Sequence, residues 1–265
     1  MLQWYSPWRN PSTGAAYPFP RPAFESVRAH RMIPILSWSS RGISNSDIAA
    51  GHFDTYIRNW ASAAKSWGHK LFLRFDREMN GWWFNWGSGT GGNTPADFVA
   101  AWRHVHNIFA TVGATNVRWV WCPNVDPYRK FTDIRLLYPG DAYVDWTCLD
   151  GYNGDNPWRS FNRLFVGSYR HVLQIAPSKP MIVGEVGSTE TGGSKARWIR
   201  NMFAVLPRRF PRIRGLLWFD QYLLGPGGHS DWPIETSVSS SAAFAKGIRT
   251  TFGQTRKHER LRHRR

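Results

Sequence analysis

Two glutamates, Glu78 and Glu185, lie at or just beyond the ends of two short apolar runs, 70–76 and 180–186, that are rich in β-forming residues. They lie far apart in the sequence, so only the fold can bring them together. Two carboxyl groups placed across one bond can divide the work of breaking it, because one protonates the leaving oxygen while the other attacks carbon. Mutual repulsion and partial burial push their pKa values apart, which assigns the roles. The alternative is that each glutamate is a structural partner of a neighbouring arginine.

Tryptophan is the most unusual feature of the composition, with 16 tryptophans among 265 residues. Many of them stand beside glycine, asparagine or proline, as in the segment 80–88, and not at helical spacing. Flat rings among polar groups suit a ligand with apolar faces and polar edges, and both sugar rings and nucleic-acid bases meet that description. Together with the two carboxyl groups, the tryptophans favour a sugar and predict hydrolysis of a glycosidic bond.

The elements that must position these residues alternate along the chain. Short apolar runs predict strands at residues 2–6, 32–38, 70–76, 117–122, 143–149, 180–186 and 213–219. Strands that alternate with helices form parallel sheets, and these runs are apolar on both faces, as buried parallel strands are. The pattern predicts an α/β fold of the (β/α)8 TIM-barrel type, in which functional residues collect at the carboxyl ends of the strands.

Helix signals separate the predicted strands. Thr94 is a cap residue that is followed by proline at the first helical position and by Asp97 at the third, and this pattern predicts a helix that ends at Gly113. Apolar residues at helical spacing predict three helices that end before Gly68, Pro177 and Pro211, and one that begins near Ser239.

The number of repeating units is one short of a closed barrel, because seven strands are predicted where eight are required. We therefore expect a TIM barrel that lacks its first strand in this chain; either the missing strand is encoded upstream or the barrel is open. Residues 1–254 are expected to form one catalytic barrel. Residues 255–265 are rich in arginine and poor in apolar residues, so we expect them to be a disordered basic tail.

The segment from Arg74 to Trp86 resembles the acid/base motif of glycoside hydrolase family 26, the β-mannanase family, in which a strand ends R-x-x-H-E-x-x-G-x-W. The resemblance implies that Glu78 is the catalytic acid/base and that Trp83 stacks on a sugar ring. Arg74 and Trp86 join the predicted substrate-binding residues, although Arg74 also suits a structural role inside the barrel.

Three further motifs follow in the order of the family. Trp121–Asn124 resembles the W-x-P-N strand end of the family, and Asn124 is expected to contact the substrate. Tyr152 matches the tyrosine that lines the sugar subsite next to the cleaved bond. Residues 184–187 resemble the G-E-x-G motif, which implies that Glu185 is the nucleophile.

Arg77 departs from the family pattern, which has histidine at this position. A fixed cation beside Glu78 would favour the ionised carboxylate, whereas a general acid must carry a proton; burial beneath the tryptophans would offset this effect. Arg77 and Trp218 complete the predicted substrate-binding residues. Glu190 and Glu235 are predicted to be solvated loop carboxylates, with contact to distal sugars as the alternative.

The resemblance implies a retaining endo-β-glycosidase that hydrolyses a plant-type polysaccharide. The first expectation is β-1,4-mannan, and the alternatives within the family are β-1,3-xylan and mixed-linkage β-glucan. An alternative of another class is a carbohydrate-binding barrel with impaired catalysis, although the presence of both glutamates argues against it. No cofactor or metal is expected, because neither a nucleotide-binding glycine motif nor metal-ligand spacing is present. The expected partner is a polysaccharide or oligosaccharide, bound by a monomer.

The net charge of +16 and the pI of about 10.5 would attract polyanions. However, the tryptophans cluster with glutamates, which repel phosphate, so no nucleic-acid partner is expected. No apolar stretch approaches the roughly 18 residues of a membrane span, so no membrane partner is expected. The family resemblance implies secretion, although the first eight residues lack the pattern of a signal peptide.

The two cysteines, Cys122 and Cys148, lie in predicted strands without a second ligand at metal-binding spacing. We expect buried free thiols, with a disulfide between neighbouring strands as the alternative.

Overall fold

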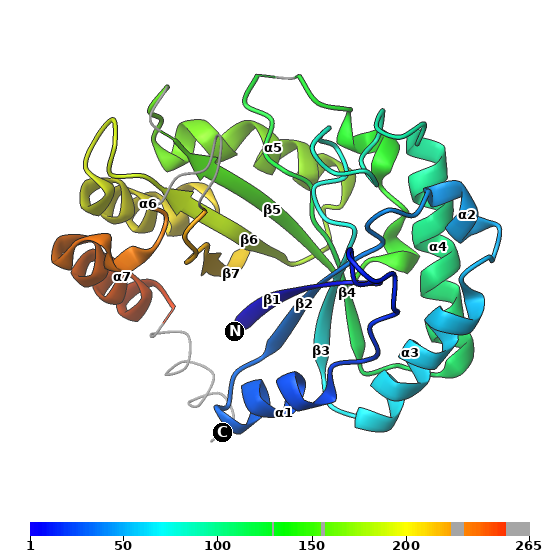
Figure 1. The fold of residues 1–265 in the computed structure, drawn as a ribbon. Helices are drawn as coiled ribbons and strands as arrows, with labels where there is room; N and C mark the ends of the chain where they lie inside the picture. The colour runs from blue at the N-terminus through cyan, green and yellow to red at the C-terminus, as the bar shows by residue number, and fades with distance from the viewer. Residues whose placement is uncertain (129, 155–156, 224–230, 253–265) are drawn as a thin grey trace, which may run out of the picture. The chain divides into compact units, whose positions relative to one another are not determined.

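The computed structural model describes residues 1–128, 130–154, 157–223 and 231–252. Within these residues, parallel strands alternate with helices, as Figure 1 shows. The strands are β1 (Leu2–Pro7), β2 (Pro34–Ser39), β3 (Leu71–Phe75), β4 (Val117–Trp121), β5 (Trp146–Asn153), β6 (Met181–Ser188) and β7 (Ile213–Trp218). They follow one another in the sheet in the order β1 to β7, so each strand neighbours the next one in the sequence.

The helices complete the alternation. They are α1 (Arg21–Ala29), α2 (Asn45–Ala49), α3 (Asp54–Trp67), α4 (Pro95–Val112), α5 (Phe161–Ile175), α6 (Lys195–Arg209) and α7 (Val238–Thr251). Two short 3-10 helices, η1 (Ile134–Leu137) and η2 (Asp141–Tyr143), lie between β4 and β5, and a third, η3 (Ile234–Thr236), precedes α7. All seven predicted strands and the helices predicted from periodicity are confirmed, while α1 and α2 were not predicted.

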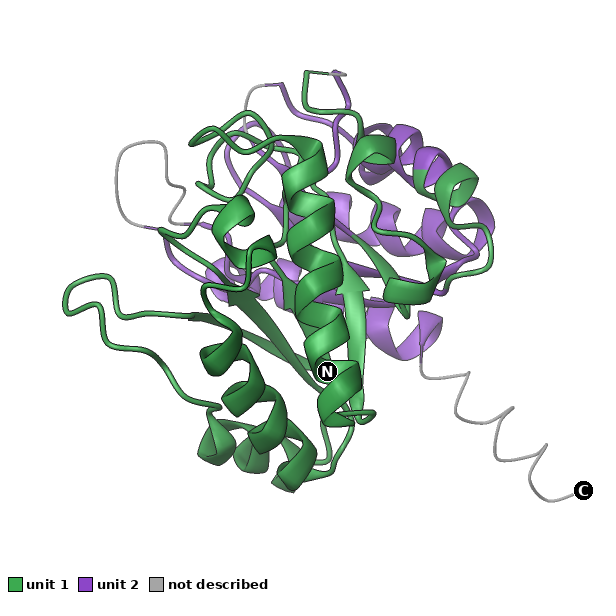
Figure 2. Cartoon of the chain, turned by 90° about the vertical axis from the view of Figure 1, so that its right-hand side faces the viewer, with its two compact units in different colours: residues 1–124, 129–148, 172–179 green, residues 125–128, 149–171, 180–265 purple. Residues whose placement is uncertain are grey.

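The chain divides into two compact units (Figure 2). The first unit contains residues 1–124, 129–148 and 172–179, and the second contains residues 125–128, 149–171 and 180–265. Strands β1 to β4 lie in the first unit, and β6 and β7 lie in the second. Strand β5 begins in the first unit and continues into the second.

The first unit has a parallel sheet in continuous register. Leu2 pairs with Pro34, and Ile35 pairs with Phe72. The capping box of α4 forms as predicted, because Thr94 and Asp97 exchange hydrogen bonds between side chain and backbone. Helix α3 ends at Gly68 in the left-handed conformation that glycine favours. An aromatic cluster packs between the sheet and these helices, and its members are Trp8, Trp38, Trp60, Phe75 and Phe109.

The second unit has two paired parallel strands, β6 and β7, and every residue of β6 is buried. Helices α6 and α7 approach each other closely, because a Cβ atom at Gly247 would lie 1.9 Å from the ring of Phe203. Phe244 of α7 contacts the rings of both Phe203 and Trp218. These contacts hold β7 and its flanking helices together.

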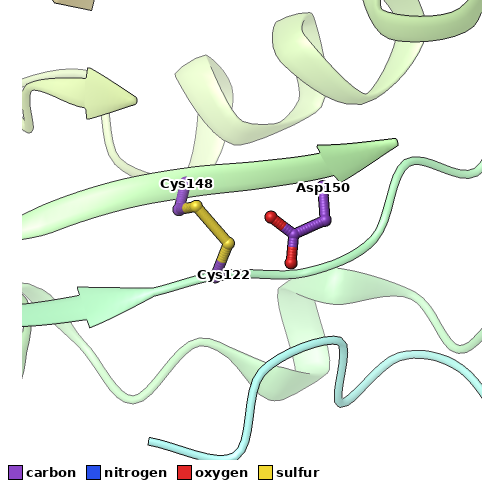
Figure 3. Close-up of side chains that lie close together, drawn as sticks. All are labelled: Cys122, Cys148 and Asp150. Carbon is purple, nitrogen blue, oxygen red and sulfur yellow. A yellow bond between two sulfur atoms is a disulfide. The ribbon is translucent and has the colours of Figure 1, made fainter. Parts of the chain in front are cut away.

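Cys122 and Cys148 form a disulfide, so the expectation of free thiols is wrong (Figure 3). Cys122 directly follows β4 and Cys148 lies on β5, and their Cα atoms are 4.3 Å apart because the two strands are paired. Both residues are fully buried. The disulfide therefore fixes the carboxyl end of β4 to its neighbour.

The predicted basic tail, residues 255–265, lies outside the described residues. Among the residues that are described, no helix has the length and apolar character needed to cross a membrane.

Candidate active site

Glu78 lies in the first unit, three residues after β3, in a short irregular segment that begins at Asp76. Its backbone has φ of +54°, and Asp76 has φ of +40°, so both residues occupy the left-handed region that side chains disfavour. The Glu78 N–H donates to the Cys122 carbonyl at 2.7 Å. Glu78 is buried. Backbone strain of this kind persists only where the surroundings enforce it, and it is frequent in functional sites.

Two side chains hold the Glu78 carboxyl group. The indole N–H of Trp83 donates to one oxygen at 2.6 Å, and the amide of Asn124 donates to the other at 2.8 Å. The first unit therefore brings together three of the residues that the sequence predicted for the site. With both oxygens hydrogen-bonded, the carboxyl group has one defined orientation.

Asn80 connects the segments that follow β3 and β4, a role that the sequence did not reveal. Its side-chain oxygen accepts from the Asn124 N–H at 2.8 Å, and its amide donates to the Asn124 carbonyl at 2.9 Å. Asn80 is 2% exposed, so these reciprocal bonds are shielded from water. They fix the backbone of Asn124, whose side chain then reaches Glu78.

Trp83 fits against the backbone of its own loop. A Cβ atom at Gly81 would lie 2.3 Å from the Trp83 ring, so only glycine allows this approach. The ring of Phe131 makes an edge contact with Trp83, with the two centroids 5.1 Å apart. The half-exposed indole thus presents one surface to solvent while its N–H remains bound to Glu78.

The guanidinium group of Arg77 lies over two aromatic rings, 4.4 Å from the centroid of Tyr5 and 4.8 Å from that of Phe84. Trp86 stacks on the same Phe84 at 4.3 Å, and its indole N–H donates to the Arg77 carbonyl at 2.8 Å. Trp86 is 3% exposed. Trp86 is therefore buried within the loop, where its ring packs on Phe84 and its N–H binds the backbone of Arg77.

Asp76 and Arg74 lie beneath this loop and are both fully buried. Asp76 accepts hydrogen bonds from the backbone N–H and the hydroxyl of Ser40, both at 2.7 Å. Burial raises the pKa of Asp76 to about 7, against the opposing effect of these hydrogen bonds. Arg74 lies on β3 within the sheet, so its position agrees with the structural role considered from the sequence.

Glu185 lies in the second unit, within β6, where the pairing of β6 with β7 shifts register between Val183 and Val186. It is buried, and the hydroxyl of Tyr152 on β5 donates to one of its oxygens. Tyr152 and Glu185 were both predicted for the site, and the second unit brings them together.

Trp232 packs against this pair, although its role was not predicted. Its ring centroid lies 5.3 Å from that of Tyr152. A Cβ atom at Gly187 would lie 2.8 Å from Trp232 and 3.4 Å from Tyr152, so glycine is needed for this packing. The three residues form one compact group beside Glu185.

Trp218, which was predicted to bind substrate, packs against two helices. Its ring makes edge contacts with Trp198 of α6 and Phe244 of α7, and its indole N–H donates to the Trp232 carbonyl at 2.9 Å. Trp218 therefore fixes the backbone that carries Trp232.

Lys195, in the first turn of α6, is a fully buried residue that sequence reasoning missed. Its ammonium group donates to the Asp231 carbonyl, to the Pro233 carbonyl at 2.9 Å and to the Thr236 hydroxyl at 2.6 Å. Burial lowers its pKa, while Glu190, Asp231, Asp220 and Glu235 act in the opposite direction. Lys195 thus fixes the segment 231–236, which includes Trp232.

Glu190 belongs to the same network, so the expectation of a solvated carboxylate is wrong for this residue. It accepts hydrogen bonds from the hydroxyls of Ser237 at 2.9 Å and Thr236 at 3.3 Å. Its own backbone N–H donates to the Asp231 carboxylate. Glu235 is exposed, as predicted.

Comparison with known proteins places this arrangement in a family. The model of glycosyl hydrolase family 26 matches residues 44–204. Endoglucanase H of Acetivibrio thermocellus is 34% identical over 236 residues, which are 86% of this chain and 25% of the relative. Mannan endo-1,4-beta-mannosidase A and B of Caldalkalibacillus mannanilyticus is 31% identical over 164 residues, which are 58% of this chain and 29% of the relative. The chain therefore spans about a quarter of the length of these two relatives.

Solved structures support the fold. The catalytic domain of the family 26 endo-beta-1,4-mannanase of Bacillus sp. JAMB-750 superposes with a TM-score of 0.66 at 18% identity, over 88% of this chain and 69% of that one. An endo-beta-1,4-mannanase of Cellulomonas fimi superposes with a TM-score of 0.66 at 19% identity, over 85% of this chain and 56% of that one. The seven parallel strands of the described residues match this barrel-type fold with one strand fewer. The chain belongs to glycosyl hydrolase family 26.

Proposed function

We propose that this protein is a retaining endo-β-glycosidase, with Glu78 as the acid/base and Glu185 as the nucleophile. The observation that carries the proposal is the pair of hydrogen bonds from Trp83 and Asn124 to Glu78, within the motif of a glycosyl hydrolase family. The bond from Tyr152 to Glu185 supports the second assignment. Retention requires the two carboxyl groups to act across one bond at a separation of about 5–5.5 Å.

In the first step, the ionised Glu185 attacks the anomeric carbon and the bond to the leaving oxygen breaks. Glu78 gives its proton to that oxygen, so the leaving sugar departs as a neutral hydroxyl compound. The sugar that remains is joined to Glu185 as an ester. Tyr152 orients the attacking carboxylate because its hydroxyl donates to Glu185.

In the second step, the Glu78 carboxylate takes a proton from water while the water oxygen attacks the same carbon. The ester bond to Glu185 breaks and its carboxylate is restored. Two displacements on one carbon leave its configuration unchanged. The two donors to Glu78 hold it in one orientation for both proton transfers.

The substrate that we propose first is β-1,4-mannan. Relatives that carry the name mannan endo-1,4-beta-mannosidase support it, and so do the mannanase structures that share the fold. The second candidate is a β-glucan, because the relative named endoglucanase H is 34% identical over 86% of this chain. Both candidates are polymers of hydroxylated pyranose rings, which suit the tryptophan-rich loop after β3.

The test combines substrate choice with stereochemistry. Reducing ends are measured from mannan, glucomannan, mixed-linkage β-glucan and β-1,3-xylan under identical conditions, and proton NMR follows the anomer that is released first. We expect the highest rate on mannan and a product of retained configuration. An inverted product would contradict the catalytic assignment. Binding to a polymer without any hydrolysis would instead favour a carbohydrate-binding barrel with impaired catalysis.

We also infer that the protein acts outside the cytoplasm. Its proposed substrate is too large to enter a cell, and the Cys122–Cys148 disulfide is typical of oxidising compartments. Alkylation before and after reduction, followed by peptide mapping of protein from the native host, tests this inference. We expect the disulfide in the exported fraction, and finding the protein only in the cytoplasm with both thiols alkylated would contradict it.

A further inference from the structure

Trp82 differs from every other tryptophan of the chain. All 16 tryptophans lie within the described residues, and Trp82 is the most exposed of them, with 72% of its surface accessible. A fully exposed indole is unfavourable in water because it carries a large apolar surface. An aromatic ring that remains exposed beside a catalytic residue is therefore a candidate for ligand contact.

The loop that carries Trp82 is well ordered. The Thr90 hydroxyl donates to the Trp82 carbonyl at 3.3 Å, and the Ser88 N–H donates to the Met79 carbonyl at 2.8 Å. A Cβ atom at Gly87 would lie 2.2 Å from the Gly81 carbonyl oxygen, so the two ends of the loop are in close contact. The exposed ring thus stands on a fixed backbone, which lowers the entropy cost of binding.

Trp82 is also adjacent to the acid/base. Its ring centroid lies 6.0 Å from that of Trp83, with the two planes at 75°. The Trp83 N–H in turn holds Glu78. A general acid protonates the leaving oxygen, so the sugars that leave must lie on the side of the bond where Glu78 stands. The chain of contacts from Glu78 through Trp83 therefore leads towards the leaving part of the substrate.

We propose that Trp82 is a platform for a sugar ring on the leaving-group side of the cleaved bond, one position beyond the sugar next to Trp83. The apolar face of a pyranose packs on the indole while its hydroxyl groups remain in water. This inference rests on the proposed function, because it takes the side of the substrate from the role of Glu78. Trp82 then raises kcat/KM for substrates that have more sugars on the leaving-group side.

The experiment compares two substrates that differ only on the leaving-group side. One is an aryl β-glycoside of the mannose oligosaccharide that fills the other side, and the second has a further mannose disaccharide in place of the aryl group. For Trp82→Ala we expect kcat/KM to fall about five- to tenfold more on the second substrate than on the first, the loss that one aromatic contact supplies. Trp82→Tyr should restore most of it, since tyrosine also offers a flat ring.

Leu136→Ala is the matched control, because Leu136 is an exposed apolar side chain of the same unit, 60% accessible. It should leave both rates unchanged. Equal losses on the two substrates for Trp82→Ala, or no recovery in Trp82→Tyr, would overturn the platform.

A binding measurement separates this inference from the proposed function. Calorimetric titration with mannohexaose is carried out on Glu185→Gln and on the double variant that adds Trp82→Ala. Weaker binding by the double variant supports the platform, and equal binding or no binding by either variant overturns it. Absence of hydrolysis by the unmodified protein would contradict the proposed function alone.

Discussion

The two proposed catalytic glutamates are held in different ways. Glu78 stands on a strained turn after β3, with φ of +54°, and its position depends on side chains from its own loop and from the segment after β4. Glu185 lies within β6, a strand that is buried throughout and whose pairing with β7 is irregular around Glu185. Both carboxyl groups need a fixed orientation, because a small displacement of either one slows the reaction. Glu78 takes its orientation from Trp83 and Asn124 on a strained turn, whereas Glu185 lies within a buried strand, so we expect Glu78 to depend more on its surroundings.

The largest expected difference between the two regions lies in the glutamates themselves. Glu185→Ala should abolish turnover on every substrate, because no glycosyl ester can form. Glu78→Ala should slow polysaccharide hydrolysis by about 10²- to 10⁴-fold, the usual contribution of general acid–base catalysis. It should spare the first step on an activated aryl glycoside, which needs little protonation.

Azide distinguishes the two variants further. It should restore turnover of aryl glycosides by Glu78→Ala and yield a glycosyl azide of retained configuration, detected by NMR, and it should not restore Glu185→Ala to that product. Glu25→Ala is the control, since this glutamate lies on α1, where it accepts from Trp67, and belongs to neither region. A Glu78→Ala variant with full activity on mannan would remove the basis of the comparison.

The second prediction concerns the bond from Trp83 to Glu78. Trp83→Phe keeps a ring but loses the indole N–H, and hydrogen bonds to charged groups contribute about 1.5–3 kcal/mol. We expect kcat/KM on mannan to fall about tenfold or more, with little change in melting temperature because Trp83 is half-exposed.

Trp67→Phe is a matched control for this change. Trp67 also donates its indole N–H to a glutamate, Glu25, at 2.9 Å, but within the contact between α1 and α3. Trp67→Phe should lower the free energy of unfolding and leave kcat/KM unchanged. If both variants lose activity equally, the Trp83 bond has no special role in positioning Glu78.

The third prediction tests the region around the nucleophile. Lys195→Met fills the same space but removes the donor to the Asp231 carbonyl and the Thr236 hydroxyl, whereas the Pro233 carbonyl still accepts from Thr236. An unsatisfied buried acceptor costs about 1–3 kcal/mol, so we expect the free energy of unfolding to fall by about 1–3 kcal/mol. Activity should fall only a few-fold, because β6 itself holds Glu185.

Denaturant unfolding and kcat/KM together check this result. Lys246→Met on α7, where the lysine is exposed, should change neither quantity. A loss of activity as large as that of Trp83→Phe, without a loss of stability, would mean that the nucleophile depends on its surroundings as much as the acid/base does.

The sequence predicted the strands and the two glutamates because both leave local signals. Apolar runs of strand length identify β3 and β6, the spacing of glycine and tryptophan after Glu78 identifies its motif, and the glycines on either side of Glu185 identify the other. Contacts between distant segments leave no such signal. The reciprocal bonds of Asn80 depend on how the loops after β3 and β4 meet.

The sequence did not predict the directions in which the side chains of Trp218 and Trp232 point. A strand sends successive side chains to opposite faces, so an error of one residue in register reverses every assignment. Trp218 on β7 faces α6 and α7, and Trp232 from the following loop packs beside Tyr152. The disulfide was missed for a similar reason, since free thiols and a bridge between strands have the same sequence pattern until the pairing of β4 with β5 is known.

The smallest expected effect concerns Asp76, at the base of the strained turn. Burial raises the pKa of Asp76 from 3.8 to about 7. Between these values the folded protein holds a proton that the unfolded chain releases, so this group stabilises the fold below about pH 4 and its contribution is lost as the pH rises towards 7. Asp76→Asn stays neutral and can still accept from the Ser40 N–H. We therefore expect the difference in unfolding free energy between variant and wild type to change steadily in favour of the variant from pH 4 to pH 7, as measured by urea denaturation.

Asp97→Asn provides a control of opposite sign. Hydrogen bonds from Thr94 lower the pKa of Asp97, so its contribution is present above the pKa of the unfolded chain, near 3.8, and is lost as the pH falls through its folded value. This variant should show a slope of opposite sign between pH 4 and about pH 5 and no slope from about pH 5 to pH 7. A flat profile for Asp76→Asn as well would mean that Asp76 is ionised in the fold and that its hydrogen bonds with Ser40 outweigh its burial. The turn that carries Glu78 would then rest on a buried negative charge, and the acid/base would experience that charge on its own side of the site.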